Sequence, residues 1–536
     1  MSVNRVPVLI VGAGAAGLAT SALLAQHGVR SLLVEKRREV FIYPKARNLS
    51  FRSLEILRGL GLRDDVHAVA EHVSDLVVKP ALNSPDEKPA LDVDAIFAGL
   101  AGLSPEPAAS YCPQSKLEPI LLADTRRRGS QVRYGWEVIS LEQDDTGVTA
   151  VIREQATGNT ETHRADYLVA ADGVHSPTRA TLGITTAGSG AWPLFVVFVY
   201  FRAPWRKFVP HLGDGDAVQV KNPEVDGLFL VAQGDLGMFA TTYFPRHGET
   251  AAQFTPQRCR ELIRAAVGEP IDVEIIEVAP WQPYEQVADQ LRCGRVFFVG
   301  DAAHTMPPFK AGGANVAIQS AHNLAWKLAA VLNGTAQPAL LSTYHAERHP
   351  VGRFSARQSC TGPQLDLLRF DDASVRLPAE EECAIFALLL GYRYRSAAVL
   401  TDDPVPADPD AVALVDELRG QPGTRVPHAW VQRVGKRVST LDLVGPGFTV
   451  LTGRGGERWR DAATSVSAAL GVPITVHGIG VDVADPDGGW AAVTGLAPGG
   501  ALLVRPDDFV GWRADALPAD PDGELHRALS AILART

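Results

Sequence analysis

The 536-residue sequence has few cysteines, and none of them is spaced as a CxxC pair. Zinc sites and dithiol redox centres usually show such pairs, and small secreted domains are far richer in cysteine. We therefore expect no metal site, no disulfide framework and a reducing, cytoplasmic location. The five cysteines are Cys112, Cys259, Cys293, Cys360 and Cys383.

Positive charge is also scarce. Lysine and arginine total 51 against 61 aspartates and glutamates, which gives a formal charge of −10. An acidic surface repels phosphate backbones, and no run of Lys and Arg is long enough to form a basic patch. A nucleic-acid partner is therefore not expected.

The long uncharged stretch at residues 7–25 does not fit a membrane span or a signal peptide. It is interrupted by Gly12, Gly14 and Gly17 and lacks a basic flank. A spanning helix needs about 20 predominantly apolar residues, and a signal peptide needs that flank. We expect no membrane association and interpret the stretch as a strand, a tight turn and a helix.

A GxGxxG motif lies inside this stretch, at residues 12–17. It follows an apolar strand, and a helix should run from it to about Gln26. Such glycines permit a tight turn, close backbone approach to a pyrophosphate and close helix packing. A second apolar strand at 31–34 leads to Glu35, which is placed to accept ribose hydroxyls. The pattern predicts a dinucleotide site, but it leaves NAD and FAD both open.

Two distant segments also combine a buried strand with an acidic turn. Residues 166–173 end in Asp172-Gly173, and residues 295–301 end in Gly300-Asp301. The second segment continues through Pro308 and Gly313 into a helix with one apolar face. Ligand sites of doubly wound sheets lie beyond the carboxyl ends of the strands, so these tips are expected to meet.

Taken together, these motifs resemble those of the single-component FAD-dependent aromatic hydroxylases, the relatives of para-hydroxybenzoate hydroxylase and phenol hydroxylase. They look most like the enzymes that tailor aromatic polyketides in antibiotic biosynthesis. Further matches lie at residues 44–47, 114–118, 307–308 and 321–328. One departure is the Phe309-Lys310-Ala311 loop, where the family often has more glycines.

The resemblance implies roles for individual residues. Glu35 would bind the adenosine ribose, and Arg47 and Gln114 the ribose and phosphate portion. Asp301 would accept hydroxyls of the ribityl chain, and Asp172 would serve both FAD and the nicotinamide nucleotide. The expected cofactor-binding residues are Gly12, Gly14, Ala15, Ala16, Gly17, Glu35, Lys36, Arg47, Gln114, Asp172, Gly300, Asp301, Pro308, Gly313, Ala314 and Asn315.

Within that set, residues 313–315 are expected to place backbone amides and a helix N-terminus against the pyrimidine edge of the flavin, where the reduced ring is negative. His304 fits an ordinary loop histidine better than a ligand. Because substrate phenols ionise readily, no catalytic residue is assigned.

By the same resemblance, the protein would be a flavoprotein monooxygenase with tightly but non-covalently bound FAD. NADPH or NADH would reduce the flavin, and O₂ would form a C4a-hydroperoxide that hydroxylates a small aromatic or polyketide-derived substrate. The alternatives are Baeyer–Villiger or epoxidising chemistry on the same fold, or a non-catalytic FAD-binding protein. A monomer and a homodimer both remain open.

The expected fold is α/β, with a Rossmann-like FAD-binding domain, an inserted antiparallel substrate sheet and a C-terminal thioredoxin-like domain without redox cysteines. In the insert, strands are expected at 194–201, 217–221, 228–233 and 238–244, with Gln219, Gln233 and Thr242 facing either ligand or solvent. Proline-rich composition near 402–412 and 420–427 is typical of linkers. The expected boundaries are 1–180 and 286–400 for the FAD-binding domain, 181–285 for the substrate domain, 401–420 for a linker and 421–536 for the C-terminal domain.

Overall fold

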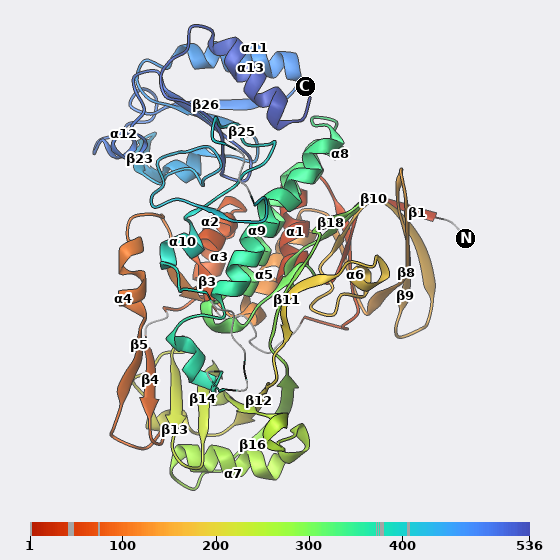
Figure 1. Ribbon diagram of the computed structural model, residues 1–536, viewed down its shortest axis with the longest axis vertical. Helices are drawn as coiled ribbons and strands as arrows, with labels where there is room; N and C mark the ends of the chain where they lie inside the picture. Colours follow the sequence, from red (N-terminus) through yellow and green to blue (C-terminus); the bar gives the residue numbers. More distant parts are fainter. Residues whose placement is uncertain are drawn as a thin grey trace.

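The computed structural model is arranged in three parts along its longest axis (Figure 1). A parallel sheet with its helices forms the middle, a largely antiparallel sheet lies at one end, and a small α/β domain lies at the other. The structure describes residues 3–40, 48–72, 75–370, 372–373, 375, 380–404 and 408–535.

The middle part is built on an eight-stranded sheet whose central strands are parallel. Its strands are β1 (Val3–Val11), β2 (Ser31–Glu35), β7 (Gln131–Tyr134), β8 (Trp136–Asp144), β9 (Gly147–Glu154), β10 (Thr160–Ala170), β18 (Arg292–Cys293) and β19 (Val296–Phe298). In the register, Val11 lies beside Val34 and Ala170, and Ala170 lies beside Phe298. The three expected strand tips therefore end together at one edge, as predicted.

Helices α1 (Ala15–Gln26), α5 (Gln114–Arg127) and α8 (Gly312–Leu332) pack beside this sheet. The apolar face predicted for the helix that follows Gly313 is confirmed in α8, and the buried side chains of all three helices share one core with the strands. Both α1 and α8 begin at the edge where the strands end, so their N-termini face the same space.

The antiparallel sheet has seven strands in the order β16-β12-β15-β14-β13-β4-β5. They are β4 (Asp75–Lys79), β5 (Lys88–Asp92), β12 (Phe195–Arg202), β13 (Ala217–Lys221), β14 (Asp226–Gln233), β15 (Leu236–Tyr243) and β16 (Glu274–Trp281). The four predicted strands are confirmed within two residues. The sequence analysis did not identify β4 and β5, which join from residues well before the insert. Helix α7 (Pro256–Val267) packs on one face, and the other face is turned toward the middle part.

The C-terminal part is a four-stranded sheet in the order β26-β25-β27-β28. Its elements are β25 (Phe448–Thr452), α11 (Arg458–Leu470), β26 (Ile474–Gly478), α12 (Gly489–Thr494), β27 (Ala501–Val504), β28 (Val510–Ala514) and α13 (Pro521–Ile532). The preceding residues 423–429 are buried, although residues 420–427 have a linker composition. Arg425 explains the difference, because its guanidinium donates to Glu55 and to the carbonyl of Leu103 in the middle part.

The remaining α-helices and strands of the described residues lie between these elements. They are α2 (Phe51–Gly59), α3 (Arg63–His67), α4 (Val93–Phe97), α6 (Pro177–Thr181), α9 (Thr343–Gln358), α10 (Ile385–Leu389), β3 (Asn48–Ser50), β6 (Ala109–Tyr111), β11 (Thr186–Ala191), β17 (Tyr284–Ala288), β20 (His304–Thr305), β21 (Tyr392–Arg393), β22 (Ala413–Leu414), β23 (Trp430–Arg433) and β24 (Lys436–Ser439). Among the described helices, none combines the length and apolar character needed to cross a bilayer.

His304 and His322 are among the buried histidines of the described residues. Burial and the nearby Arg348 charge together lower the pKa of His304 to about 3. Burial and the Arg52 charge likewise lower the pKa of His322 to about 3. Both rings are therefore neutral in the folded protein over the whole range in which an unfolded histidine titrates.

These histidines should make the fold sensitive to acid. Below pH 6.5 the unfolded chain binds protons that the folded chain does not, so the free energy of unfolding falls. Each histidine should contribute a loss of about 1 kcal/mol per pH unit between pH 6.5 and 5. Urea unfolding of the protein at both pH values should show a smaller loss for His304→Asn than for the wild type. His526→Asn, at an exposed site, should keep the wild-type dependence, and parallel curves for all three proteins would contradict the assignment.

Candidate active site

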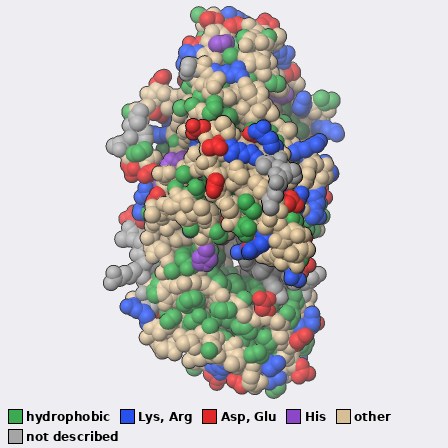
Figure 2. Space-filling view, turned by 90° about the vertical axis from the view of Figure 1, so that its right-hand side faces the viewer, with side chains coloured by type: hydrophobic (Ala, Val, Ile, Leu, Met, Phe, Trp, Pro, Cys, Tyr) green, Lys and Arg blue, Asp and Glu red, His purple; other side chains and the backbone are tan. Residues whose placement is uncertain are grey.

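A cavity of about 1960 Å³ lies between the strand tips of the parallel sheet and the inner face of the antiparallel sheet. Figure 2 shows hydrophobic side chains gathered on the lower part of one face, the part that holds the antiparallel sheet. Ordinary small-molecule pockets have volumes of about 300–1000 Å³. This cavity therefore has room for a large cofactor and a second molecule together.

The cofactor-binding residues expected from the sequence meet at one end of this cavity. Gly17 is not among the lining residues because it packs beneath the turn, and Arg47 lies outside the described residues. Those that line the cavity are Gly12, Gly14, Ala15, Ala16, Glu35, Lys36, Gln114, Asp172, Gly300, Asp301, Pro308, Gly313, Ala314 and Asn315.

Two glycines of the GxGxxG turn are required by close backbone approach. Gly12 has φ +103°, and a Cβ there would lie 2.2 Å from the carbonyl oxygen of Ala171. A Cβ on Gly17 would lie 1.9 Å from the carbonyl oxygen of Gly12. Any side chain at either position would push α1 and the tip of β10 away from β1, and would so deform the cavity edge.

Glu35 holds the same turn from the tip of β2. Its carboxylate accepts hydrogen bonds from the Ala13 N–H at 2.8 Å and from the Arg37 N–H and Nε at 2.9 and 3.0 Å. Burial alone would raise the pKa of Glu35, but the hydrogen bonds from Arg37 and Ala13 outweigh it and lower the pKa below its usual value. The site thus keeps a buried, ionised carboxylate at the cavity edge.

Asp172 shapes the turn after β10. Its two carboxylate oxygens accept from the Ser176 hydroxyl at 2.6 Å and from the Thr178 N–H at 3.0 Å. Arg179 closes the turn onto β19, because it donates to the carbonyl oxygens of Ala302 and Val174. The carboxylate is therefore engaged in holding the turn whose backbone lines the cavity.

The start of α8 forms the opposite wall. The side chain of Asn315 is used internally, since its Oδ1 accepts from the Ser50 N–H at 2.9 Å and its Nδ2 donates to the carbonyl oxygens of Asn48 and Ala311. What α8 presents to the cavity is thus the backbone of residues 313–315, the group expected to face the flavin. The exposed Asp301 side chain lies beside it on the cavity lining.

These residues fit an anionic dinucleotide. Neither α1 nor α8 has a side-chain cap or an acidic residue in its first turn. Each therefore leaves backbone N–H groups and the positive end of its dipole directed at the cavity. Asn48, which the sequence analysis missed, also lines it, and its buried Oδ1 has no hydrogen-bond partner among the described residues.

The far wall of the cavity is the inner face of the antiparallel sheet, and it is almost entirely apolar. One row crosses all seven strands and ends in a carboxylate; its members are Glu277, Tyr200, Met238, Leu230, Ala217, Leu76 and Leu91. A parallel row consists of Ala279, Phe198, Ala240 and Leu228. Alternation along β12 could have indicated Phe198 and Tyr200, but which face meets the cofactor is set by tertiary packing.

The polar residues considered for this sheet do not form the wall. Gln219 is buried, donates to Asp226 at 3.2 Å and is not part of the cavity lining. Thr242 is buried outside the lining as well, and the side chain of Gln233 lies outside the described residues. His304 is buried against Ser320 and does not line the cavity, but it lies in the short strand β20 and not in a loop as expected.

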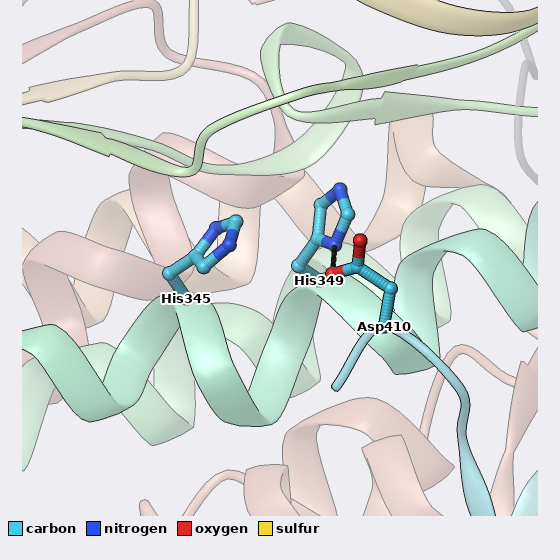
Figure 3. Close-up of side chains that lie close together, drawn as sticks. All are labelled: His345, His349 and Asp410. Atoms are coloured by element: carbon cyan, nitrogen blue, oxygen red, sulfur yellow. Dashed lines mark hydrogen bonds and ion pairs between the residues drawn. The ribbon is translucent and has the colours of Figure 1, made fainter. Parts of the chain in front are cut away.

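One group of possible metal ligands lies elsewhere among the described residues. The ligand atoms of His345, His349 and Asp410 come within 4.8 Å of one another (Figure 3). The Nδ1 of His345 accepts from the Leu291 N–H at 3.2 Å, and the Nδ1 of His349 lies 3.1 Å from Asp410 Oδ1. These hydrogen bonds tie α9 to two neighbouring loops and account for the grouping without an ion.

Comparison with known families matches both ends of the chain. The FAD binding domain family matches residues 5–359, and the family described as aromatic-ring hydroxylase, C-terminal, matches residues 419–536. The first match covers the strand tips, the antiparallel sheet and α8, and the second covers the C-terminal sheet.

Individual relatives match over nearly the full length. A tetracenomycin A2 monooxygenase-dioxygenase of Streptomyces glaucescens is 42% identical, with 100% of this chain and 98% of the relative covered. An aklavinone 12-hydroxylase of Streptomyces purpurascens is 36% identical over the whole of both chains. The crystal structure of aklavinone-11 hydroxylase with FAD and aklavinone has a TM-score of 0.88 at 34% identity, with both chains fully covered. The chain therefore belongs to the FAD-dependent aromatic-ring hydroxylases, and it is a flavoprotein monooxygenase.

Proposed function

We propose that this monooxygenase hydroxylates a polycyclic aromatic substrate of polyketide type, with NADPH or NADH as reductant and O₂ as oxidant. The proposal rests on one continuous cavity, in which the residues expected to bind the cofactor face the broad apolar wall of the antiparallel sheet. Relatives named for tetracenomycin and aklavinone chemistry support the same substrate class.

The chemistry would be divided between cofactor and protein. When bound, FAD would supply the redox chemistry, in which the two electrons of the nicotinamide nucleotide reduce O₂ so that one oxygen atom enters the aromatic ring and the other leaves as water. The apolar rows of the antiparallel sheet would exclude water from that step and hold the ring system flat. The oxygen-transferring species, the domain boundaries, the oligomeric state and a cytoplasmic location stay predictions.

We further propose individual contacts to the cofactor. Glu35 would accept ribose hydroxyls in addition to the hydrogen bonds that it receives from Ala13 and Arg37. The N-terminus of α1 would bind the pyrophosphate, and the backbone of residues 313–315 would donate to the flavin ring. Asp301, at the tip of β19, would accept from the ribityl chain, and the contact of Arg47 stays a prediction outside the described residues.

The reaction is tested directly with the yellow, FAD-loaded protein. We expect NADPH or NADH oxidation to accelerate when a tetracyclic quinone or phenol is added, and isotopically labelled O₂ to place one labelled oxygen in the product. Mass analysis of fragments separates a hydroxylated ring from a ring-expanded lactone or an epoxide. A protein that binds FAD but oxidises neither nucleotide faster with any such aromatic would overturn the proposal.

Replacing Glu35 should weaken FAD binding. Glu35→Ala removes the acceptor of the Ala13 N–H inside the turn, and leaving such a buried group unpaired costs about 1–3 kcal/mol. Equilibrium dialysis should therefore show a clearly higher Kd for FAD. Glu142→Ala, at an exposed site on β8, is the matched control, and an unchanged Kd for Glu35→Ala would place the ribose elsewhere.

A larger side chain on the apolar wall should weaken the binding of large substrates more than that of small ones. Ala279 lines the cavity beside Phe198, so Ala279→Phe would add a ring to the space assigned to the substrate. We expect KM to rise about tenfold or more for a tetracyclic quinone, the effect of losing about 1.4 kcal/mol of binding, and much less for 1-naphthol. Ile276→Phe, on the same strand but 40% exposed and outside the cavity lining, should leave both values unchanged. Equal effects on large and small substrates would contradict the placement.

A further inference from the structure

We propose that the Asp507–Asp508 turn of the C-terminal domain is a positioning element for the flavin site. Arg52 and Asn323 contact this turn and would connect it to the two cavity walls that face the cofactor. The C-terminal domain would then take part in the reaction through geometry, although it contributes no residue to the cavity lining.

The turn lies between β27 and β28 and is directed at the middle part of the molecule. Asp508 has φ +66°, a left-handed conformation that is uncommon for a residue other than glycine. In this conformation its Oδ2 lies 3.0 Å from Arg52 NH1, while the Asp507 carbonyl oxygen accepts from Arg52 NH2 at 2.9 Å. The guanidinium is thus held by two successive residues of the C-terminal domain.

A first path leads from Arg52 to the cavity through the start of α2. Arg52 is the second residue of α2. Ser50, the last residue of β3, directly precedes the first residue of this helix. Both the N–H and the hydroxyl of Ser50 donate to Asn315 Oδ1, at 2.9 and 3.2 Å. Since Ser50 and Asn315 both line the cavity, a shift of Arg52 would move two of its walls.

A second path runs along α8. Asn323 donates to Asp507 Oδ2 at 3.0 Å and to Glu347 Oε2 at 2.6 Å. Glu347 also accepts from Lys327 Nζ at 2.7 Å and from both terminal nitrogens of Arg505 at 2.6 and 2.8 Å. α8 is one continuous helix from these residues to its N-terminus at the cavity.

These contacts can fix a single geometry because most of their side chains are buried, although that of Asp508 is 17% exposed. The side chains of Lys327, Glu347 and Arg505 are 0% exposed, and that of Asp507 is 1% exposed. A buried charge that loses its partner is strongly destabilising. The turn therefore cannot shift relative to Arg52 or α8 without breaking buried ion pairs. The turn and the two walls should therefore move as one body.

The chain offers a matched control on the same helix. Arg58 on α2 donates to Asp442 of the C-terminal part at 2.6 and 2.8 Å, so it also joins the two parts. This pair is 22% and 23% exposed, and its residues do not line the cavity. Arg58→Met would remove a contact between the parts while leaving both paths from the turn intact.

The test compares Asp508→Ala with Arg58→Met in the FAD-loaded enzyme. For Asp508→Ala we expect an altered visible circular dichroism spectrum of the bound flavin, a Kd for FAD raised at least fivefold, and a larger share of NAD(P)H oxidation ending as hydrogen peroxide. Arg58→Met should match the wild type in all three. The flavin spectrum and the Kd need no substrate, so they remain informative if the proposed substrate class is wrong.

Asp508→Asn is the second variant, because asparagine tolerates the left-handed conformation and keeps an acceptor for Arg52. It should fall between the wild type and Asp508→Ala, and it replaces Asp508→Ala if that variant does not fold. A wild-type flavin spectrum and Kd in the folded Asp508 variants, with only the melting temperature lowered, would overturn the proposal and leave the turn a purely stabilising contact.

Discussion

The structure depends on the alignment of four neighbouring parallel strands. β2, β1, β10 and β19 end in register, so the turns that follow them are brought to one edge although they are far apart in the sequence. Backbone approach at Gly12 and Gly17 is so close that α1 cannot pack there with any larger residue. Every later feature of the site, including the two uncapped helix N-termini, is placed relative to this edge.

A second constraint lies between the middle and C-terminal parts, where buried ion pairs accompany an apolar contact between α8 and the C-terminal core. Arg52, Glu55, Arg425 and Asp508 form one connected group, in which the side chains of Arg52, Glu55 and Arg425 each have more than one partner. Such groups contribute little net stability compared with apolar packing, but they tolerate no alternative pairing. Their main effect is to specify one arrangement of the two parts.

The sequence predicted the parts of the site that depend on local backbone conformation. It did not predict the parts that depend on contacts between segments far apart in the chain. The strand tips, the helix starts and most of the residues that line the cofactor end follow from glycine and acid positions that local geometry requires. The apolar wall could not be assembled in the same way, because β4 and β5 join it from residues well before the insert. The linker composition of residues 420–427 was misleading for the buried residues 423–427, since nothing local indicates that Arg425 reaches Glu55.

The wall and the cofactor edge come from different stretches of the chain, and this separation has an evolutionary consequence. Substitutions along the apolar rows from Leu91 to Glu277 can reshape the accepted ring system without touching the turns that hold the cofactor. Descendants of one ancestral enzyme could therefore diverge rapidly in the compounds they modify while their redox machinery stays the same.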